Sequence, residues 1–276
     1  MDRFIINYNG NKYQETKKYL KDDIEASNFD YIAEPFGGIF GFSRYYYLLK
    51  KDNKKLKFLI NDTDKELINF YKDLKKDFEG TLNKLKEQFE EITKDMTEDI
   101  HLTKYLRTNK DNTDLKFIKL ISASCMGCSG IQKFNTKYNN FLKLKDEYKD
   151  FFKRSTFYNL DCEDFLKVIK NKKNILVYFD PPYFNSNNRN YNSSFINKEE
   201  YHDGTTFYIT ILNYFKNSSK PCLFVLNKID VINYLFKSYL YKEYKGNYQN
   251  TMKQKKDIKG IKTKKHHMVY MNNFKI

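Results

Sequence analysis

The sequence has little that would suit an extracellular or membrane protein. Its 276 residues include no tryptophan, four prolines and only four cysteines. Cys125, Cys128, Cys162 and Cys222 are too few and too scattered for a disulfide framework, which agrees with a reducing compartment. No stretch approaches the roughly 20 apolar residues that cross a bilayer, and Met1–Phe4 does not begin a signal peptide. We therefore expect a soluble, intracellular protein with no membrane partner.

The sequence also lacks a convincing metal site. Cys125 and Cys128 form a C-x-x-C pattern, but no second Cys pair or Cys/His pair follows at the spacing of a zinc finger. His266 and His267 lie far away in the sequence. Because structural zinc takes four ligands, we expect no metal.

The sequence has fewer acidic than basic residues. Lys and Arg number 50 against 35 Asp and Glu, a formal charge of +15, and 24 Tyr and 24 Phe interleave rings with this charge. Nucleic acid is the natural partner of such a surface. Biased base composition in the coding DNA also explains a chain rich in Asn, Lys, Ile, Tyr and Phe and poor in Gly and Pro. Composition alone leaves both explanations open.

One stretch, Ile175–Tyr183, organises the chain. Ile175–Phe179 is a short, bounded apolar run typical of a buried central strand. Pro181 and Pro182 end it, because proline cannot donate to a sheet ladder. Asp180 is therefore expected at the carboxyl end of the strand, the edge of an open α/β sheet at which ligands bind.

The residue types after this strand suit methylation of an amino group. An exocyclic amino nitrogen is a poor nucleophile, because its lone pair is delocalised into the neighbouring π system. The Asp180 carboxylate and the Pro181 carbonyl can accept hydrogen bonds from its two N–H groups. These bonds would free the lone pair and stabilise the positive charge that develops on the nitrogen. Tyr183 can stack on the base. The alternative is an ordinary strand-to-loop turn in which Asp180 bonds only locally.

A second part of the chain has the pattern of a nucleotide-cofactor site. Asp30–Glu34 is predicted to be a strand, Pro35–Gly41 a glycine loop, and a helix follows from Ser43 to Leu49. Glycines let backbone approach a ligand, and a helix N-terminus favours a negative group. Phe58–Ile60 is predicted to be a second strand, after which Asp62 is placed to accept from ribose hydroxyls.

The remaining pattern predicts one α/β core with one insertion, which the length of the chain allows. Strand-like runs cease between Ile60 and Thr156 except near Ile121, so residues 1–71 and 154–276 are assigned to the core and residues 72–153 to a mainly helical lobe. Ile121–Tyr138 is expected to be a hairpin or loop that projects Lys133, Asn135 and Lys137. Further expected helices are Gln14–Leu20, Lys65–Lys75, Phe207–Phe215 and Val231–Tyr241, and further expected strands are Thr156–Asp161, Cys222–Leu226 and His266–Met271.

Taken in order, these motifs resemble those of the Dam-type adenine-specific DNA methyltransferases, the D12 class. Tyr8–Tyr13 is similar to the family's aromatic-x-G-G-K-Y motif, and Glu34–Gly38 to its E-P-F-x-G motif. Asp180–Tyr183 is similar to the catalytic tetrapeptide D-P-P-Y. Lys133–Asn135 resembles the R-x-N of its DNA-reading hairpin. The resemblance covers most of the chain.

The resemblance implies a Rossmann-like, S-adenosylmethionine-dependent methyltransferase core with an inserted target-recognition domain. It implies methyl transfer to N6 of a flipped-out adenine in double-stranded DNA, without an obligate protein partner. Lys12 and the hairpin residues Lys133 and Asn135 are expected to contact DNA. The catalytic set is Asp180, Pro181, Pro182 and Tyr183. The cofactor set is Tyr8, Gly10, Asn11, Lys12, Glu34, Pro35, Phe36, Gly37, Gly38, Asp62, Asp161 and Asp180.

Three departures from the family pattern bear on the alternatives. Phe40 replaces the second glycine of the usual G-x-G loop, Asn11 replaces the second glycine of G-G-K, and the hairpin's usual P-F-G is missing. The first two are the features that favour a non-catalytic DNA-binding relative, against which the intact D-P-P-Y argues. N4-cytosine and protein-amide methyltransferases use a related tetrapeptide, usually with Ser or Asn in place of Asp180.

Overall fold

The structure is a computed structural model that describes residues 4–6, 12–109, 111–123, 129–182, 204–228, 230–246 and 265–273. The chain divides into two compact units, each described by itself below. Of the described residues, the helical unit contains 4–6 and 71–153. The sheet unit contains 12–70, 154–182, 204–228, 230–246 and 265–273.

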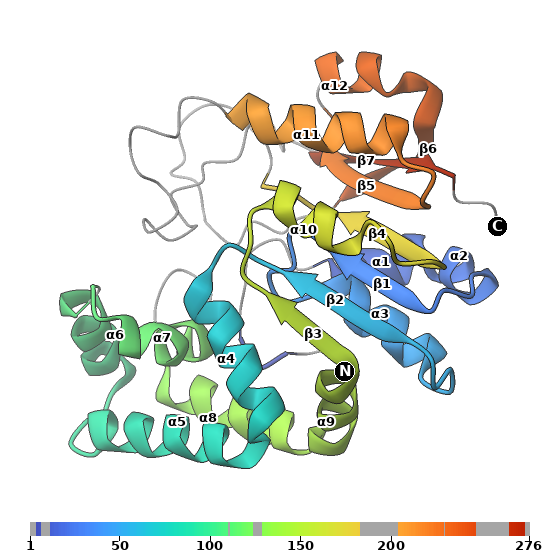
Figure 1. Ribbon diagram of the computed structural model, residues 1–276. Coiled ribbons are helices and arrows are strands. Elements are labelled where there is room, and N and C mark those ends of the chain that lie inside the picture. The colour runs from blue at the N-terminus through green and yellow to red at the C-terminus, as the bar shows by residue number, and fades with distance from the viewer. Residues whose placement is uncertain are drawn as a thin grey trace, which may run out of the picture. The chain divides into compact units, whose positions relative to one another are not determined.

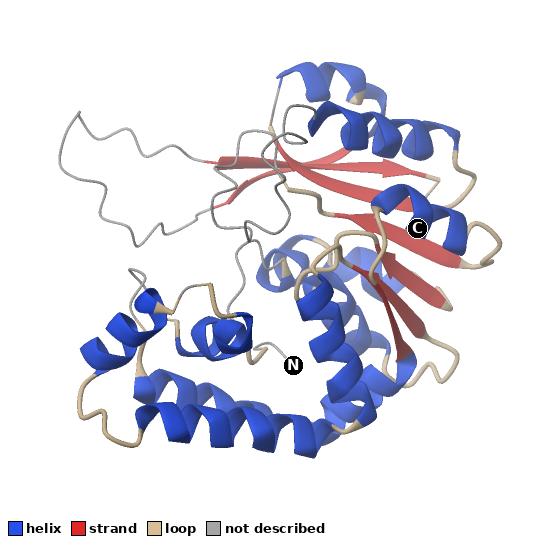
Figure 2. Ribbon diagram, turned by 60° about the vertical axis from the view of Figure 1, so that its left-hand side comes forward, coloured by secondary structure: helices blue, strands red, loops and turns tan. Residues whose placement is uncertain are grey.

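The described part of the sheet unit is built on one mostly parallel sheet, which confirms the predicted fold class. In sequence order its strands are β1 (Tyr31–Glu34), β2 (Lys57–Asn61), β3 (Ser155–Tyr158), β4 (Ile175–Phe179), β5 (Cys222–Asn227), β6 (Leu240–Gly246) and β7 (Lys265–Asn272). Their spatial order is β3-β2-β1-β4-β5-β7-β6. The first five are parallel, and β7 runs antiparallel between β5 and β6. Figure 2 shows these strands in red with helices on both faces.

Helices cover the two faces of this sheet (Figure 1). In the sheet unit they are α1 (Tyr13–Tyr19), α2 (Lys21–Ala26), α3 (Gly41–Lys50), α10 (Cys162–Ile169), α11 (Gly204–Asn217) and α12 (Asp230–Leu235). Helix α4 (Lys65–Lys76) follows β2 and contains the boundary between the two units.

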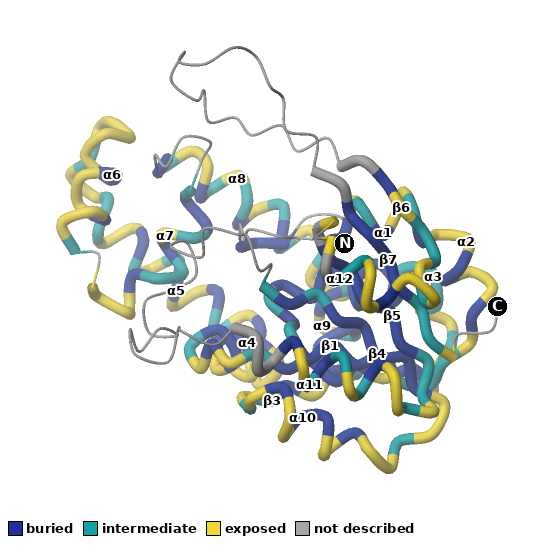
Figure 3. Tube along the Cα trace, turned by 90° about the horizontal axis from the view of Figure 1, so that it is seen from above, coloured by how far each residue is buried: buried dark blue, intermediate teal, exposed yellow. Residues whose placement is uncertain are grey.

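Strand β4 is buried on both faces, as a central parallel strand should be. Ile175, Val177 and Phe179 belong to the apolar cluster formed with α10 and α11. The alternating residue Tyr178 lies on the other face, where its ring stacks on Phe42 of α3 with centroids 4.1 Å apart. Figure 3 shows β4, with its neighbours β1 and β5, as buried. The strand that leads to Asp180 is therefore held from both sides.

The helical unit contains the end of α4, α5 (Phe78–Thr93), α6 (Asp99–Thr108), α7 (Lys116–Ser122), α8 (Ile131–Leu142) and most of α9 (Lys145–Arg154). Buried aromatic rings form much of its interior, such as Phe89 of α5 stacked on Phe134 of α8 at 3.7 Å.

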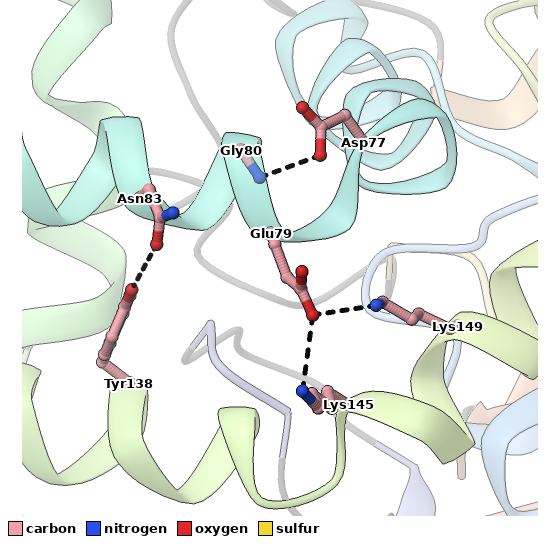
Figure 4. Close-up of polar contacts among 7 residues, drawn as sticks. All are labelled: Asp77, Glu79, Gly80, Asn83, Tyr138, Lys145 and Lys149. Carbon is pink, nitrogen blue, oxygen red and sulfur yellow. Dashed lines mark hydrogen bonds and ion pairs between the residues drawn. The ribbon is translucent and has the colours of Figure 1, made fainter.

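Polar contacts join the helices of this unit near its surface (Figure 4). The Asp77 carboxylate accepts from the Gly80 amide at 2.9 Å and caps α5. The Glu79 carboxylate lies 2.9 Å from Nζ of Lys149 and 3.4 Å from Nζ of Lys145, which ties α5 to α9. These pairs are exposed, so solvent screens them and their contribution to stability is small.

Two predicted elements were wrong. The hairpin or loop predicted over Ile121–Tyr138 is wrong from Ile131 onward, because Lys133, Asn135 and Lys137 lie on helix α8, and α7 extends to Ser122. Phe134, Tyr138 and Phe141 follow a helical spacing that buries one face of α8, and this periodicity outweighs the Ser/Gly punctuation before it. The only strand-like feature of the described residues there is the isolated bridge between Ala123 and Ser129.

The helix predicted over Val231–Tyr241 is also too long. Helix α12 ends at Leu235, a short 3-10 turn follows, and Leu240 begins β6. Leu240 and Tyr241 belong to a strand because β6 pairs with β7, in which the partner of Leu240 is Tyr270, 30 residues further along the chain. No proline or glycine nearby in the sequence indicates that the helix ends and a strand begins, so tertiary pairing decides where this happens.

Within the part of the chain that the structure describes, no helix is long and apolar enough to span a membrane.

Candidate active site

The candidate site lies where the strand order of the sheet reverses. Strand β1 is flanked by β2 and β4, and Ala33 pairs with Leu59 on one side and Val177 on the other. Strands β2 and β3 lie on one side of β1, and the later strands β4 and β5 lie on the other. Ligands of open α/β sheets bind at such a point, beyond the carboxyl ends of the strands. Here those ends carry Glu34 and Asp180.

Asp180 is a largely buried carboxyl group held by a lysine. Its side chain is 16% exposed, and Oδ1 lies 3.1 Å from Nζ of Lys12, whose side chain is 3% exposed. Burial raises the pKa of Asp180, and the ammonium group of Lys12 opposes that rise. The pair therefore keeps a carboxylate available at a water-poor position.

The turn after Asp180 is fixed by helix α11. The Tyr208 hydroxyl donates to the carbonyl oxygen of Pro182 at 2.6 Å. Tyr208 also belongs to the apolar cluster beneath the sheet. The Asp180–Pro182 backbone is therefore anchored at both ends, as a site that must present acceptors in fixed positions requires. Tyr183 lies outside the described residues.

Glu34 is buried at the carboxyl end of β1. Its Oε1 accepts from the backbone amide of Ser43, in the first turn of α3, at 2.7 Å. Desolvation raises the pKa of Glu34 to about 8 in spite of this bond. At neutral pH the group is therefore mostly protonated, so it caps α3 without placing a full negative charge there.

The glycine loop packs directly on the end of β2. The Gly37 amide donates to the Asn61 carbonyl at 2.6 Å, and a Cβ on Gly37 would lie 2.5 Å from Cγ2 of Ile60. Gly38 has φ 47° and Phe40 has φ 43°. Only glycine adopts this left-handed region without strain, so Phe40 is a costly residue at its position. Its ring is fully buried, and we infer that this burial offsets the strain.

Two of the acids predicted to contact the cofactor, Asp62 and Asp161, are held by backbone amides. Asp62 Oδ2 accepts from Gly38 N at 2.8 Å, and Oδ1 accepts from Asp64 N at 2.9 Å. Asp161 is the N-cap of α10, and its Oδ1 accepts from Asp164 N at 2.8 Å. The carboxylate of Asp62 thus joins the glycine loop to the end of β2.

Two buried polar residues that our sequence analysis did not single out complete this framework. The amide of Asn61 donates to the carbonyls of Pro35 and Leu160, and its Oδ1 accepts from Leu160 N. Arg44 is fully buried beneath the loop and donates from Nε to Ile39 O at 3.1 Å. The sequence offered two signals for these residues. Asn61 is a polar residue at the end of a strand, and Arg44 is a charged residue on an otherwise apolar helix face.

The structure brings most of the predicted site residues together in the sheet unit. Lys12 and Asp180 form one group, and Glu34 through Gly38 with Asp62 form the neighbouring loop. Tyr8, Gly10 and Asn11 lie outside the described residues. Lys133 and Asn135 belong to the helical unit, where Asn135 Oδ1 accepts from Nζ of Lys86 at 2.8 Å.

The described residues near the loop fit a nucleoside-containing cofactor. Ribose hydroxyls need acceptors, and the Asp62 carboxylate has more acceptor sites than the two amide bonds use. Phe36, Tyr158 and Leu160 are partly buried at the edge of the apolar cluster and offer surface for a flat base. Among the residues described, no group of His, Cys, Asp or Glu side chains is arranged to hold a metal ion. Cys125 and Cys128 lie outside them.

A mostly parallel seven-stranded sheet with a glycine loop after β1, an acid after β2 and Asp-Pro-Pro after β4 defines a Rossmann-like methyltransferase core. The chain belongs to the D12 class N6 adenine-specific DNA methyltransferase family, whose sequence profile matches residues 8–252. Members of this class use S-adenosylmethionine and act on DNA. No curated protein matches the chain.

Proposed function

We propose that this chain methylates N6 of an adenine at a specific site in double-stranded DNA, with Asp180, Pro181, Pro182 and Tyr183 as its catalytic residues. The observation that carries the assignment is the Asp180 carboxylate, buried at the switch point of the sheet and held 3.1 Å from Lys12. A non-catalytic relative would have no use for this costly buried group.

The target adenine has to leave the double helix. A base stacked in a duplex cannot present its amino group to a carboxylate that is 16% exposed, so the base is flipped into the site. Tyr183 stacks on it there. The turn through Pro182 is held by Tyr208, so its hydrogen-bond acceptors are already in position when the base arrives.

In the reaction, the chain contributes hydrogen-bond acceptors. Asp180 and the Pro181 carbonyl accept hydrogen bonds from the two N–H groups of the amino group, which frees the nitrogen lone pair. The bound cofactor supplies a sulfonium methyl; a nitrogen–carbon bond forms as the carbon–sulfur bond breaks, and its electron pair stays on sulfur. The nitrogen becomes positively charged, is stabilised by the same acceptors, and then loses one proton.

The cofactor is assigned to the loop beside this carboxylate. Phe36 and Gly38 line it, and Asp62 accepts from the ribose. The other residues assigned to the cofactor are Tyr8, Gly10, Asn11, Lys12, Glu34, Pro35, Gly37 and Asp161. The bonds from Asp62 to Gly38 and Asp64 support this assignment, because they hold the carboxylate before any ligand arrives.

Recognition of the DNA sequence is assigned to the inserted helical lobe, residues 72–153, which we take as the target-recognition domain. Lys133 and Asn135 are the candidate base-reading residues, now carried by helix α8. Lys86 fixes the amide of Asn135, which reduces the entropy lost when that amide meets a base edge. Lys12 is buried against Asp180, which supports a contact at the target nucleotide over one with a distant phosphate.

Replacing Asp180 tests the assignment. Asp180→Ala and Asp180→Asn should each lower the single-turnover rate of adenine methylation by at least about a hundredfold, because a preorganised charged acceptor is lost. Both should bind S-adenosylmethionine with nearly the affinity of the wild type in calorimetry. Wild-type methylation by Asp180→Ala would refute the assignment, and a wild-type chain that binds no cofactor would favour the non-catalytic relative.

A further inference from the structure

The first turn of helix α1 contacts the edge of the sheet at two separate places. Lys12, the N-cap residue, lies 3.1 Å from Asp180 after β4. Glu15, three residues further on, has its Oε2 2.9 Å from Nδ1 of His267 on β7. The same oxygen accepts from the hydroxyl of Tyr244 on β6 at 3.0 Å. Residues three apart share one side of a helix, so a single turn carries both contacts.

The second contact is buried and lies at the same edge of the sheet as the first. His267 is fully buried, and the side chain of Glu15 is 15% exposed. His267 pairs with Asn227, the last residue of β5, which is parallel to β4. Glu15 therefore accepts two contacts, from His267 and from Tyr244, that fix its side chain at a position where water is largely excluded.

We propose that Glu15 and His267 are positioning residues for methyl transfer, which fix the first turn of α1 so that Lys12 stays against Asp180. This inference rests on the proposed role of Asp180. Neither residue touches the substrate. They act through Lys12, because a shift of α1 that breaks the Glu15–His267 contact also moves the ammonium group away from the carboxylate.

The pair also acts on Asp180 through its charges. Glu15 raises the pKa of Asp180, whereas His267 lowers it. The groups that face Asp180 are Lys12 and Glu15 from α1, His267 from β7, Glu34 from β1, and Tyr178 from its own strand.

The experiment uses Glu15→Gln and His267→Gln in the full chain. Single-turnover methylation of an adenine-containing duplex is followed against pH with saturating S-adenosylmethionine, and thermal unfolding is recorded alongside. Because Lys12 moves away from Asp180 in both variants, the pKa of Asp180 should rise and the acid limb of the rate should move to higher pH in both. In Glu15→Gln, loss of the Glu15 charge alone would move the acid limb to lower pH instead. Both plateau rates should fall by about tenfold, since a small misplacement at a site is costly.

Asp23→Asn is the matched control. Asp23 on α2 accepts from Nζ of Lys242 on β6 at 2.6 Å, so it also ties the N-terminal helices to β6. It is not among the groups that shift the pKa of Asp180. This variant should change the unfolding temperature and leave the acid limb in place.

A shift to higher pH in Glu15→Gln supports the inference, because loss of the Glu15 charge alone would shift the acid limb to lower pH. A shift to lower pH or a wild-type profile in Glu15→Gln overturns it, whether or not His267→Gln folds. Asp180→Asn separates this failure from a wrong function. If that variant is inactive while both Gln variants keep the wild-type profile, only the positioning role fails; if Asp180→Asn is active, the catalytic assignment fails as well.

Discussion

Glu34 shows how a residue of a binding motif can serve the fold. It ends β1, is 2% exposed, and accepts from the first turn of α3. Arg44 is buried nearby and lowers the pKa of Glu34, but desolvation is the larger effect. A carboxyl group that is mostly protonated at neutral pH can cap α3 and still leave its N-terminus favourable to the negatively charged group of the cofactor that we propose binds there.

The raised pKa of Glu34 should appear in stability measurements. Between pH 4.5 and about 8 the folded chain holds a proton on Glu34 that the unfolded chain has lost. Stability should therefore fall as pH rises through this window, by up to about 1.4 kcal/mol per pH unit. Glu34→Gln cannot ionise and removes the effect. Urea unfolding of both proteins at several pH values measures the difference, and parallel stability curves would contradict the prediction.

At the scale of elements, the site depends on how closely the loop after β1 meets the end of β2. The Gly37–Asn61 bond, the Asn61 side chain and the Asp62–Gly38 bond all cross this junction. Each partner is fixed before a ligand binds. The loop therefore forms a preorganised support that requires glycine at one position for space and at the next for its backbone angle.

Gly37→Ala tests this junction. The added Cβ meets Ile60 at 2.5 Å and the backbone oxygen of Asn61 at 3.0 Å, and the backbone cannot move aside cheaply. We expect a loss of about 1–3 kcal/mol of unfolding free energy and weaker cofactor binding. Gly80→Ala is the control, because its Cβ meets only the flexible side chain of Asp77 in the helical unit. Equal cofactor affinities in the two variants would refute the role of the loop.

For the whole molecule, the formal charge of +15 predicts binding to DNA that weakens steeply with salt. Many lysines fall between residues 253 and 265, most of which lie outside the described part of the chain. Lysines in such a run serve mainly as phosphate contacts, which give affinity without sequence information. Reading of the sequence is expected from the helical unit instead.

This division of roles predicts two different mutant behaviours. Lys255→Ala with Lys256→Ala should weaken binding to all duplexes and lower the slope of log affinity against log salt by about 2. Asn135→Ala should relax the choice of site by about 1–3 kcal/mol at one base pair. Methylation rates on a preferred site and its single-base variants measure the second effect. Unchanged discrimination in both Asn135→Ala and Lys133→Ala would remove α8 from the recognition surface.

The sequence by itself determined the features that depend on local pattern and covalent geometry. The apolar run Ile175–Phe179 ends at proline, and the structure has β4 over the same residues. The strand predicted before Pro35 likewise ends at Glu34, although β1 begins at Tyr31, one residue later than predicted. In each case a residue type limits its own backbone or that of its neighbours, so no distant partner is needed to predict the element.

Only the tertiary structure decided which groups meet. Lys12 and Asp180 are separated by most of the sheet unit in sequence, and Glu15 and His267 by 252 residues. Strand β6 likewise depends on pairing with β7, which lies far along the chain. Burial and pairing energies of this kind are set by three-dimensional packing, which a local window of sequence does not contain.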